Sequence, residues 1–251
     1  MRRVTATRYV TALREGGSLP GLVEADDDGL YVVKFSGAGQ GPGSLVSEVI
    51  AGELGRAIGL RVPELVVIEI PPELGHAEPD PEIKGLIEAS PGINVGMDFL
   101  PGALPFDLAH SRAVDPDLAA EIVWFDWLIT NIDRTARNPN LLTWHREIRL
   151  IDHGAAFFRQ HGAVPLSETA AKPTPMMAAH LLLPAAGEID AAANRLTGPA
   201  LEAVAASVAA VPSEWLGAGA EAKRREFELF LQARLKDRSR MAEDLRGDDQ
   251  Q

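Results

Sequence analysis

The sequence predicts an α+β protein with a β-rich amino-terminal lobe, residues 1–100, joined to a mainly helical carboxy-terminal lobe, residues 101–251. Two observations support this prediction. Short β-branched and aromatic runs separated by turn signals dominate the first 70 residues, whereas the chain from residue 174 onward is rich in Ala and Leu. A chain of 251 residues is long enough for two lobes that share a cleft.

The first 35 residues contain three segments with strand character. These are Thr7–Leu13, Gly21–Ala25 and Leu30–Phe35. A strong turn signal, Asp26-Asp-Asp-Gly29, separates the second segment from the third. We therefore expect a three-stranded antiparallel unit whose first connection, Glu15–Pro20, is rich in glycine.

One helix and two further strands complete the amino-terminal lobe. Apolar residues recur at helical spacing over residues 44–59, where Ser44 is a suitable N-cap and Gly59 a suitable end. Strands are predicted at Glu64–Ile70 and Val95–Leu100. The Pro- and Gly-rich residues 71–92 between them are predicted to form a loop with at most one helical turn.

Helices dominate the remainder of the predicted fold. Asp115 and Pro116 form a good N-cap and first-turn pair for a helix that runs to about Thr130. A short hairpin is expected from Leu141–Trp144 and Ile148–Ile151, and an amphipathic helix over Glu221–Leu245.

Charge and composition exclude several classes of partner. The chain has 36 acidic and 24 basic side chains, a formal charge of −12, which repels nucleic acid and anionic lipid. It has no cysteine, so neither a disulfide nor thiol chemistry is expected. The amino terminus lacks the apolar run of a signal peptide, and no apolar stretch approaches the ~18 residues of a membrane span. We expect a soluble, cytoplasmic protein without direct nucleic-acid or membrane binding.

The densest polar segment, Asn131–Asn140, holds three of the five asparagines of the chain and follows the predicted apolar helix. Twelve residues later a hydrophobic strand ends at Asp152, and the intervening hairpin would bring this carboxylate beside Asn138. Mg²⁺ prefers one or two carboxylates, completed by water and phosphate oxygens. We therefore expect Asn138 and Asp152 to bind Mg²⁺, which leaves Asp133 to orient or deprotonate a hydroxyl group. Each residue alone would more commonly cap a helix or form a turn, so the ordered set carries the prediction.

Lys34 is the only lysine among the first 80 residues and lies within a predicted strand. A lysine there can reach a nucleotide phosphate, although an exposed position on a half-buried strand is the alternative. Glu48 shares a helix face with Gly52, Gly55 and Gly59, and this glycine stripe would let the helix approach the sheet closely. The expected result is a lysine–glutamate pair of the kind that holds the phosphate-binding lysine of kinases.

Two glycine-rich stretches, Glu15–Pro20 and Ser36–Gly43, compete for the role of covering nucleotide phosphates. The first lies between strands and precedes Lys34, so we favour it and its residues Gly16, Gly17 and Ser18. Neither stretch has the Walker A spacing, which argues against an ordinary P-loop NTPase.

The order of these features resembles the protein-kinase superfamily. Asp133-Arg-Thr-Ala-Arg-Asn138 and Ile148-Arg-Leu-Ile-Asp-His-Gly154 are similar to the catalytic loop and metal-binding segment of those kinases. FDWLITNIDRTARNPNLL is similar to the HipA-like kinases, which share this arrangement with phosphatidylinositol-3-kinase-like enzymes. The segments LREGGSLPG, LYVVKF and EVIAGELGRAIGLRVPE also look like that family, and the resemblance covers about residues 8–160.

This resemblance implies a bilobal protein-kinase-like fold that binds ATP and Mg²⁺. It implies that Asp133 is the catalytic base, that Asn138 and Asp152 are the Mg²⁺ ligands, and that Lys34 contacts the ATP phosphates. Ser18 would be a phosphate-loop serine open to autophosphorylation.

The resemblance also implies that the segment Gly96–Leu100, which contains Met97, Phe99 and Leu100, is the hinge that meets adenine. The resemblance does not assign the remaining polar residues near the predicted site. We expect Asp126 to orient the 131–138 loop, and Arg134 and Arg137 to lie in solvent or bind phosphate.

The expected activity is transfer of the γ-phosphate of ATP to a hydroxyl, either Ser or Thr of a protein, the chain itself included, or a small molecule. Two departures from the pattern are Thr135, where histidine is usual, and His153, where phenylalanine is commoner. The sequence leaves open an antitoxin-like partner. It also leaves open two alternative functions: nucleotidyl (AMP) transfer on the same fold, and a non-catalytic nucleotide-binding regulatory module.

Overall fold

The computed structural model of the protein describes residues 1–13, 19–38 and 41–246. The strands are β1 (Arg2–Ala12), β2 (Gly21–Ala25), β3 (Leu30–Lys34), β4 (Leu65–Ile70), β5 (Gly92–Asp98), β6 (Leu104–Pro105), β7 (Leu141–Trp144) and β8 (Glu147–Leu150). The helices are α1 (Pro42–Ala57), α2 (Pro81–Glu88), α3 (Pro116–Leu128), α4 (Ile189–Ala209), α5 (Ser213–Leu216), α6 (Ala220–Lys236) and α7 (Met241–Arg246). The predicted α+β class is confirmed, whereas the division into lobes at residue 100 stays a prediction.

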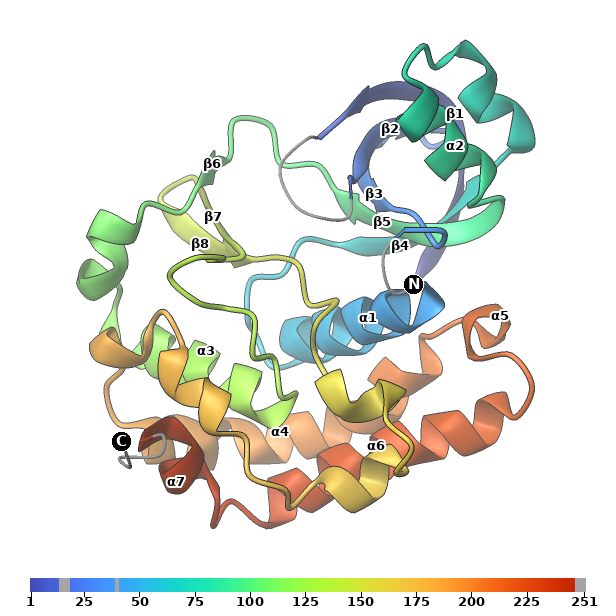
Figure 1. The fold of residues 1–251 in the computed structure, drawn as a ribbon. Helices are drawn as coiled ribbons and strands as arrows, with labels where there is room; N and C mark the ends of the chain where they lie inside the picture. Colours follow the sequence, from blue (N-terminus) through green and yellow to red (C-terminus); the bar gives the residue numbers. More distant parts are fainter. Residues whose placement is uncertain (14–18, 39–40, 247–251) are drawn as a thin grey trace.

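Five strands close into a small barrel in the order β1-β2-β3-β5-β4 (Figure 1). The predicted antiparallel unit of β1, β2 and β3 is part of it. The two halves of β1 have different partners: residues 2–5 pair with β4 in parallel, and residues 6–12 pair with β2. Register shifts after Ala6 and Tyr9 interrupt the second half, and such irregularities bend a strand. The length and bending of β1 therefore allow it to close the barrel.

The barrel has its own apolar interior, which α2 covers at one end (Figure 1). Ile83 and Ile87 of α2 are buried against this interior. The prediction of a loop over residues 71–92 was wrong, because the segment contains α2 and a 3₁₀ helix, Pro72–Ala77. Asp80 accepts hydrogen bonds from the first-turn amides of α2, and Pro81 occupies its first position, so the Asp-Pro pair was a readable helix start.

Helix α1 begins earlier than predicted. Its N-cap is Gly41 and Pro42 occupies the first turn, whereas the Ser44 hydroxyl donates to the Gly41 carbonyl at 2.9 Å. Gly59, with φ of +91°, lies in the turn after the helix and has no neighbour within 4 Å of an added Cβ, so it is not a packing glycine. Gly52, in contrast, allows close packing of the helix, since an added Cβ would lie 2.4 Å from the side chain of Leu65 in β4.

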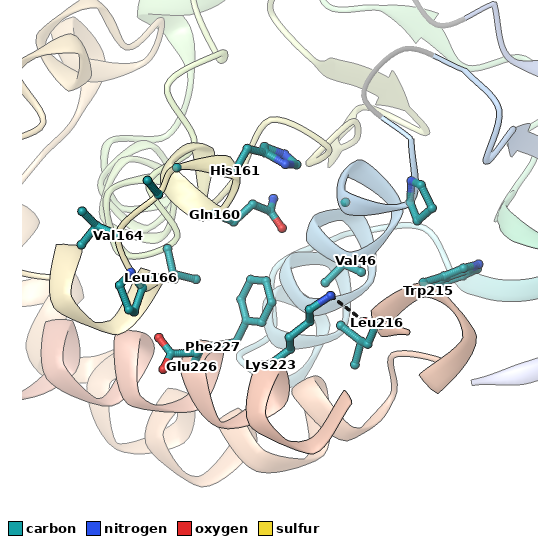
Figure 2. Close-up of a pocket in the computed structure, with 15 residues that line it drawn as sticks. Val46, Gln160, His161, Val164, Leu166, Trp215, Leu216, Lys223, Glu226 and Phe227 are labelled. Carbon is teal, nitrogen blue, oxygen red and sulfur yellow. Dashed lines mark hydrogen bonds between the residues drawn. The ribbon is translucent and has the colours of Figure 1, made fainter. Parts of the chain in front are cut away.

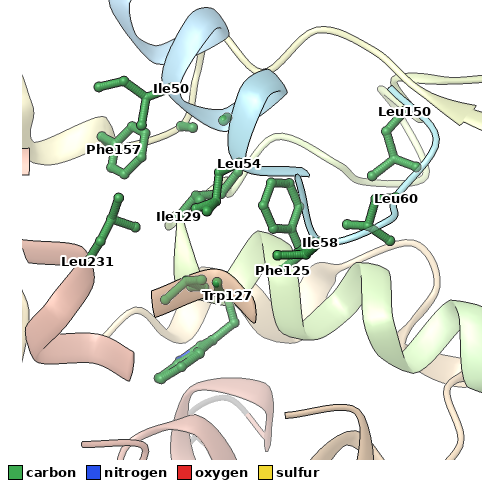
Figure 3. Close-up of a cluster of buried hydrophobic side chains, with 14 of the residues drawn as sticks. Ile50, Leu54, Ile58, Leu60, Phe125, Trp127, Ile129, Leu150, Phe157 and Leu231 are labelled. Carbon is green, nitrogen blue, oxygen red and sulfur yellow. The ribbon is translucent and has the colours of Figure 1, made fainter. Parts of the chain in front are cut away.

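Helix α1 lies between the barrel and the carboxy-terminal helices, and most of its apolar side chains belong to a second, larger core (Figure 1). Figure 3 shows Ile50 and Leu54 of α1 within the same cluster as Phe125, Phe157 and Leu231. Helix α3 is buried from Ala119 onward apart from Glu121, and its Asp115 N-cap accepts hydrogen bonds from two first-turn amides as predicted. Because α3 ends inside this core, the polar residues that follow it start from a rigid base.

The second sheet consists of β6, β7 and β8. The β7–β8 hairpin confirms the prediction, with the second strand one residue earlier. His145 and Arg146 at its turn both have positive φ, as a two-residue hairpin turn of type I′ requires. The hairpin returns the chain to the loop that precedes it, because the Ile151 amide donates to the Asn140 carbonyl at 3.1 Å. The chain then reaches the end of α3, where the Phe157 amide donates to the Ile129 carbonyl at 2.8 Å.

The carboxy-terminal residues form several helices, and the single helix predicted over Glu221–Leu245 is instead α6 and α7, separated at residues 237–240. Arg234 of α6 is buried and donates to the carbonyls of Trp127 and Leu128 at the end of α3, at 2.8 and 3.1 Å. Its guanidinium lies 4.0 Å from the centre of the Trp127 ring. Within the described residues, no helix has both the length and the apolar composition needed to span a bilayer.

Candidate active site

Two of the sequence-predicted residues, Glu48 and Asp152, meet at a third, Lys34. The Nζ atom of Lys34, at the end of β3, lies 2.5 Å from Glu48 Oε2 of α1 and 2.5 Å from Asp152 Oδ1 after β8. The Glu48 side chain is 2% exposed and that of Lys34 17%, whereas that of Asp152 is 43% exposed. The alternative of an exposed strand lysine is therefore wrong. The cluster has a buried end at Glu48 and an end open to solvent at Asp152.

Both members of the buried pair are held in their charged forms. Burial alone would lower the pKa of Lys34, but the charges of Glu48 and Asp152 outweigh it and raise the pKa above its usual value. Burial alone would raise the pKa of Glu48, but the Lys34 charge and a hydrogen bond from His153 lower it. A lysine fixed in this way presents a permanent positive charge beside Asp152.

Asp152 occupies an unusual backbone conformation. Its φ of +56° lies in the left-handed region, which residues other than glycine rarely adopt. The next peptide is held in place, because the His153 amide donates to Glu48 Oε2 at 2.9 Å. Strain of this kind persists only where the surroundings impose it, and it concentrates at functional sites.

The predicted loop after α3 positions a second carboxylate. Asn138 Nδ2 donates to Asp133 Oδ2 at 2.7 Å, and Asn140 Nδ2 contacts the same oxygen at 3.4 Å. A carboxylate only accepts, so the amide nitrogen of Asn138 must face Asp133 and its oxygen takes no part in this bond. The loop therefore unites Asp133 with Asn138 and leaves an amide oxygen for another ligand.

A buried polar cluster around Asp126 of α3 supports this loop. Arg134, which the sequence analysis placed in solvent or on phosphate, is instead 0% exposed, and its Nε donates to Asp126 Oδ2 at 2.6 Å. His180 Nε2 lies 2.8 Å from the same oxygen, and Asn131 Nδ2 donates to Asp126 Oδ1 at 2.9 Å. Asp126 thus orients the loop as expected, through the two loop residues Asn131 and Arg134.

The charges of this cluster are also set by burial and neighbours. Burial would raise the pKa of Asp126, but the Arg134 charge and the hydrogen bond with His180 lower it below the usual range. The sequence analysis missed His180, which lies 54 residues from Asp126. A bridge between Thr135 and His180 brings the two segments together, and no local signal in the sequence marked it.

Two pockets lie near one another, with His161 in the lining of both. One, of about 500 Å³, is lined by Asp133, Gly154 and Phe158 among others, so it opens onto the predicted catalytic carboxylate. The other, of about 580 Å³, lies between the start of α1, residues 160–166 and helices α5 and α6 (Figure 2). Its Lys223 donates to the Leu216 carbonyl, and Glu226 accepts from Ser167, so their polar groups already have partners. The pocket at Asp133 is the better candidate for an acceptor site.

The remaining predicted residues are distributed as follows. Met97 is on β5, opposite Val32 and Leu65, and Phe99 follows the strand with its amide donating to the Leu30 carbonyl. Leu100 is buried just before the connection to β6. Gly16, Gly17 and Ser18 lie outside the described residues.

No group of three or more His, Asp and Glu side chains within the described residues is arranged to hold a metal ion. A Mg²⁺ site of the kind expected needs only one or two carboxylates, with phosphate and water oxygens for the rest. Asp152 supplies a solvent-open carboxylate, and Asn138 an amide oxygen that its bond to Asp133 leaves unused. This donor set fits Mg²⁺.

Comparisons with known proteins identify the family of this chain. Residues 7–244 match the family model of HipA-like kinases, so the chain belongs to the HipA-like kinase family. Among solved structures, it is similar to the Helicobacter pylori proinflammatory kinase CtkA, with a TM-score of 0.60 and 11% sequence identity. The likeness covers 98% of this chain and 96% of CtkA, and at this identity it shows a shared fold. No curated protein sequence matches this chain.

Proposed function

We propose that this chain is a cytoplasmic, Mg²⁺-dependent kinase that transfers the γ-phosphate of ATP to Ser or Thr of a protein, itself included. The observation that carries the proposal is the meeting of Lys34, Glu48 and Asp152 at one cluster, with a solvent-open end. Family membership supports phosphoryl transfer as the reaction class. We further propose that the barrel and the helical part act as two lobes around the nucleotide.

At the nucleotide end of the site, positive charge would bind the ATP phosphates. Lys34, kept cationic by its two carboxylate partners, would bind ATP phosphates, and Glu48 would hold its ammonium in place. Asp152 and Asn138 would hold Mg²⁺, which neutralises charge on the phosphates when bound. On phosphate binding, Asp152 would exchange its contact with Lys34 for the cation. Because the Asp152 side chain is 43% exposed, its carboxylate would stay hydrated after leaving Lys34 and would not be buried without a partner.

At the acceptor end, the site would place a hydroxyl group beside the Asp133 carboxylate. Asp133 faces a pocket of about 500 Å³, in which a hydroxyl can approach its carboxylate. Asn138 and Asn140 fix Asp133 Oδ2, so the other oxygen would accept the hydroxyl proton. The acceptor oxygen would bond to the γ-phosphorus as the bond from that phosphorus to the bridging oxygen breaks and ADP leaves.

Two further roles complete the proposal. Met97, Phe99 and Leu100 would contact adenine, since they lie where β5 leaves the barrel for the second sheet. Gly16, Gly17 and Ser18 would cover the phosphates, as the order along the chain suggests.

The experiment that tests this function compares ATP labelled at the γ-phosphate with ATP labelled at the α-phosphate. Each is incubated with the protein, Mg²⁺ and a generic protein acceptor. Transfer of the γ-label alone supports the kinase. Transfer of the α-label instead would establish nucleotidyl transfer, and transfer of neither label, with ATP bound, would favour a regulatory module.

A further inference from the structure

Two buried polar atoms face each other beside the Lys34–Glu48 pair. Glu48 Oε1 and His153 Nδ1 have no hydrogen-bond partner among the described residues, and they lie 3.6 Å apart. The backbone amide of His153 meanwhile donates to the other oxygen of the same carboxylate. Since unpartnered buried polar groups are costly, the imidazole and the carboxylate have a reason to close this short gap.

The other side of the imidazole fixes where its proton lies. His153 Nε2 is 3.3 Å from Nη2 of Arg134. A guanidinium only donates hydrogen bonds, so Nε2 must be the acceptor and the ring proton must sit on Nδ1. That proton points toward Glu48 Oε1. The imidazole therefore accepts from Arg134 of the catalytic loop, and its Nδ1 atom lies 3.6 Å from the carboxylate that holds Lys34.

The ring has little freedom to turn away. His153 is 0% exposed and stands edge-on to Phe125, with ring centres 6.0 Å apart and an interplanar angle of 76°. Arg134 is equally fixed by Asp126 and by the Asn140 carbonyl. The imidazole thus lies between an arginine and a carboxylate that are both held by further hydrogen bonds.

We propose that His153 is a positioning residue that couples the orientation of the Lys34–Glu48 pair to the loop that carries Asp133. The inference rests on the proposed function of these residues. The path starts at Lys34 of β3 and passes to Glu48 of α1 and then to His153 after β8. From His153 it continues to Arg134 of the catalytic loop and ends at Asp126 of α3. A shift of the loop would therefore reach the phosphate-binding lysine.

The test is a double-mutant cycle on the dissociation constant of Mg·ATP, measured by calorimetry. His153→Phe keeps the ring volume but removes both polar contacts, and we expect about ten-fold weaker binding, as for the loss of one hydrogen bond to a charged group. His153→Gln retains one donor and one acceptor and should recover part of the affinity. In a Glu48→Gln background, His153→Phe should cause no further loss, because its route to Lys34 is already broken.

The control is His110→Phe, which changes an exposed histidine elsewhere and should leave affinity unchanged. Thermal melts identify any variant that is unfolded. Equal losses from His153→Phe in both backgrounds, or no loss in either, would overturn the proposal.

A second readout does not depend on nucleotide. The nitrogen chemical shifts of the His153 ring should report the proton on Nδ1, and a proton on Nε2 would contradict the relay. If the wild-type protein binds no Mg·ATP at all, the proposed function fails, and the ring shifts still decide the coupling between His153 and its two neighbours.

Discussion

Replacement of Arg134 by methionine should cause a large loss of stability. The side chain is 0% exposed, and it donates to both oxygens of Asp126, to the carbonyls of Pro139 and Asn140, and to His153. Methionine fills similar volume but leaves the Asp126 carboxylate buried without its main countercharge. Breaking a buried pair from one side costs about 3 to 5 kcal/mol.

The expected change is measurable by thermal unfolding. For a chain of this size 1 kcal/mol corresponds to about 2 to 4 °C, so Tm should fall by about 6 to 20 °C. The matched control is Arg137→Met in the same loop, whose side chain is exposed and whose loss should shift Tm little. Combining Arg134→Met with Asp126→Leu should restore part of the stability, because it removes the uncompensated charge. An Arg134→Met variant as stable as Arg137→Met would refute the reasoning.

Four further predictions concern other parts of the molecule. The pKa of Asp126 is lower in the folded state than its ordinary value of 3.8. Its contribution to stability is therefore fully present above about pH 3.8 and is lost as the pH falls through the folded-state pKa. Asp126→Asn should therefore flatten the decline in unfolding free energy measured below about pH 5. Arg234→Met should lower the free energy of unfolding in urea by about 3 kcal/mol, since three backbone carbonyls lose a charged donor. A loss no larger than that from the same substitution at an exposed helix arginine would contradict this. Gly52→Ala should cost about 1 kcal/mol, because its Cβ would press on buried Leu65, and an unchanged Tm would show that this side chain yields freely. Lys34→Met should weaken Mg·ATP binding by about ten-fold or more in calorimetry, as expected for a lost charged contact; equal affinity would remove its phosphate role.

Most individual elements were predictable, because their signals are local. The Asp115-Pro116 pair marks the start of α3, and the turn at Asp26–Gly29 separates β2 from β3. The chemistry of the site was also readable in part, since a lone strand lysine and an ordered Asp…Asn…Asp series are unusual patterns. The structure brings Lys34 to Glu48 and Asp152, as the sequence analysis expected for the first contact.

What escaped prediction depends on contacts between distant segments. The parallel pairing of β1 with β4 joins residues more than 60 positions apart, and nothing in either strand specifies its partner. His180 reaches Asp126 from a segment whose local sequence indicates only helix. The burial of Arg134 likewise follows from the convergence of α3 and the hairpin, so its loop context was misleading.

The measurement that tests the central claim most directly is the intact mass of the purified protein after incubation with Mg²⁺ and ATP. Wild type is compared with Asp133→Asn, which keeps the shape of the side chain and removes the proposed base. We predict a phosphoryl-sized gain in wild type and at least a hundred-fold slower gain in the variant, as expected from the ~10²–10⁴-fold contribution of a positioned base. An equal gain in both proteins, or a gain the size of AMP, would contradict the account.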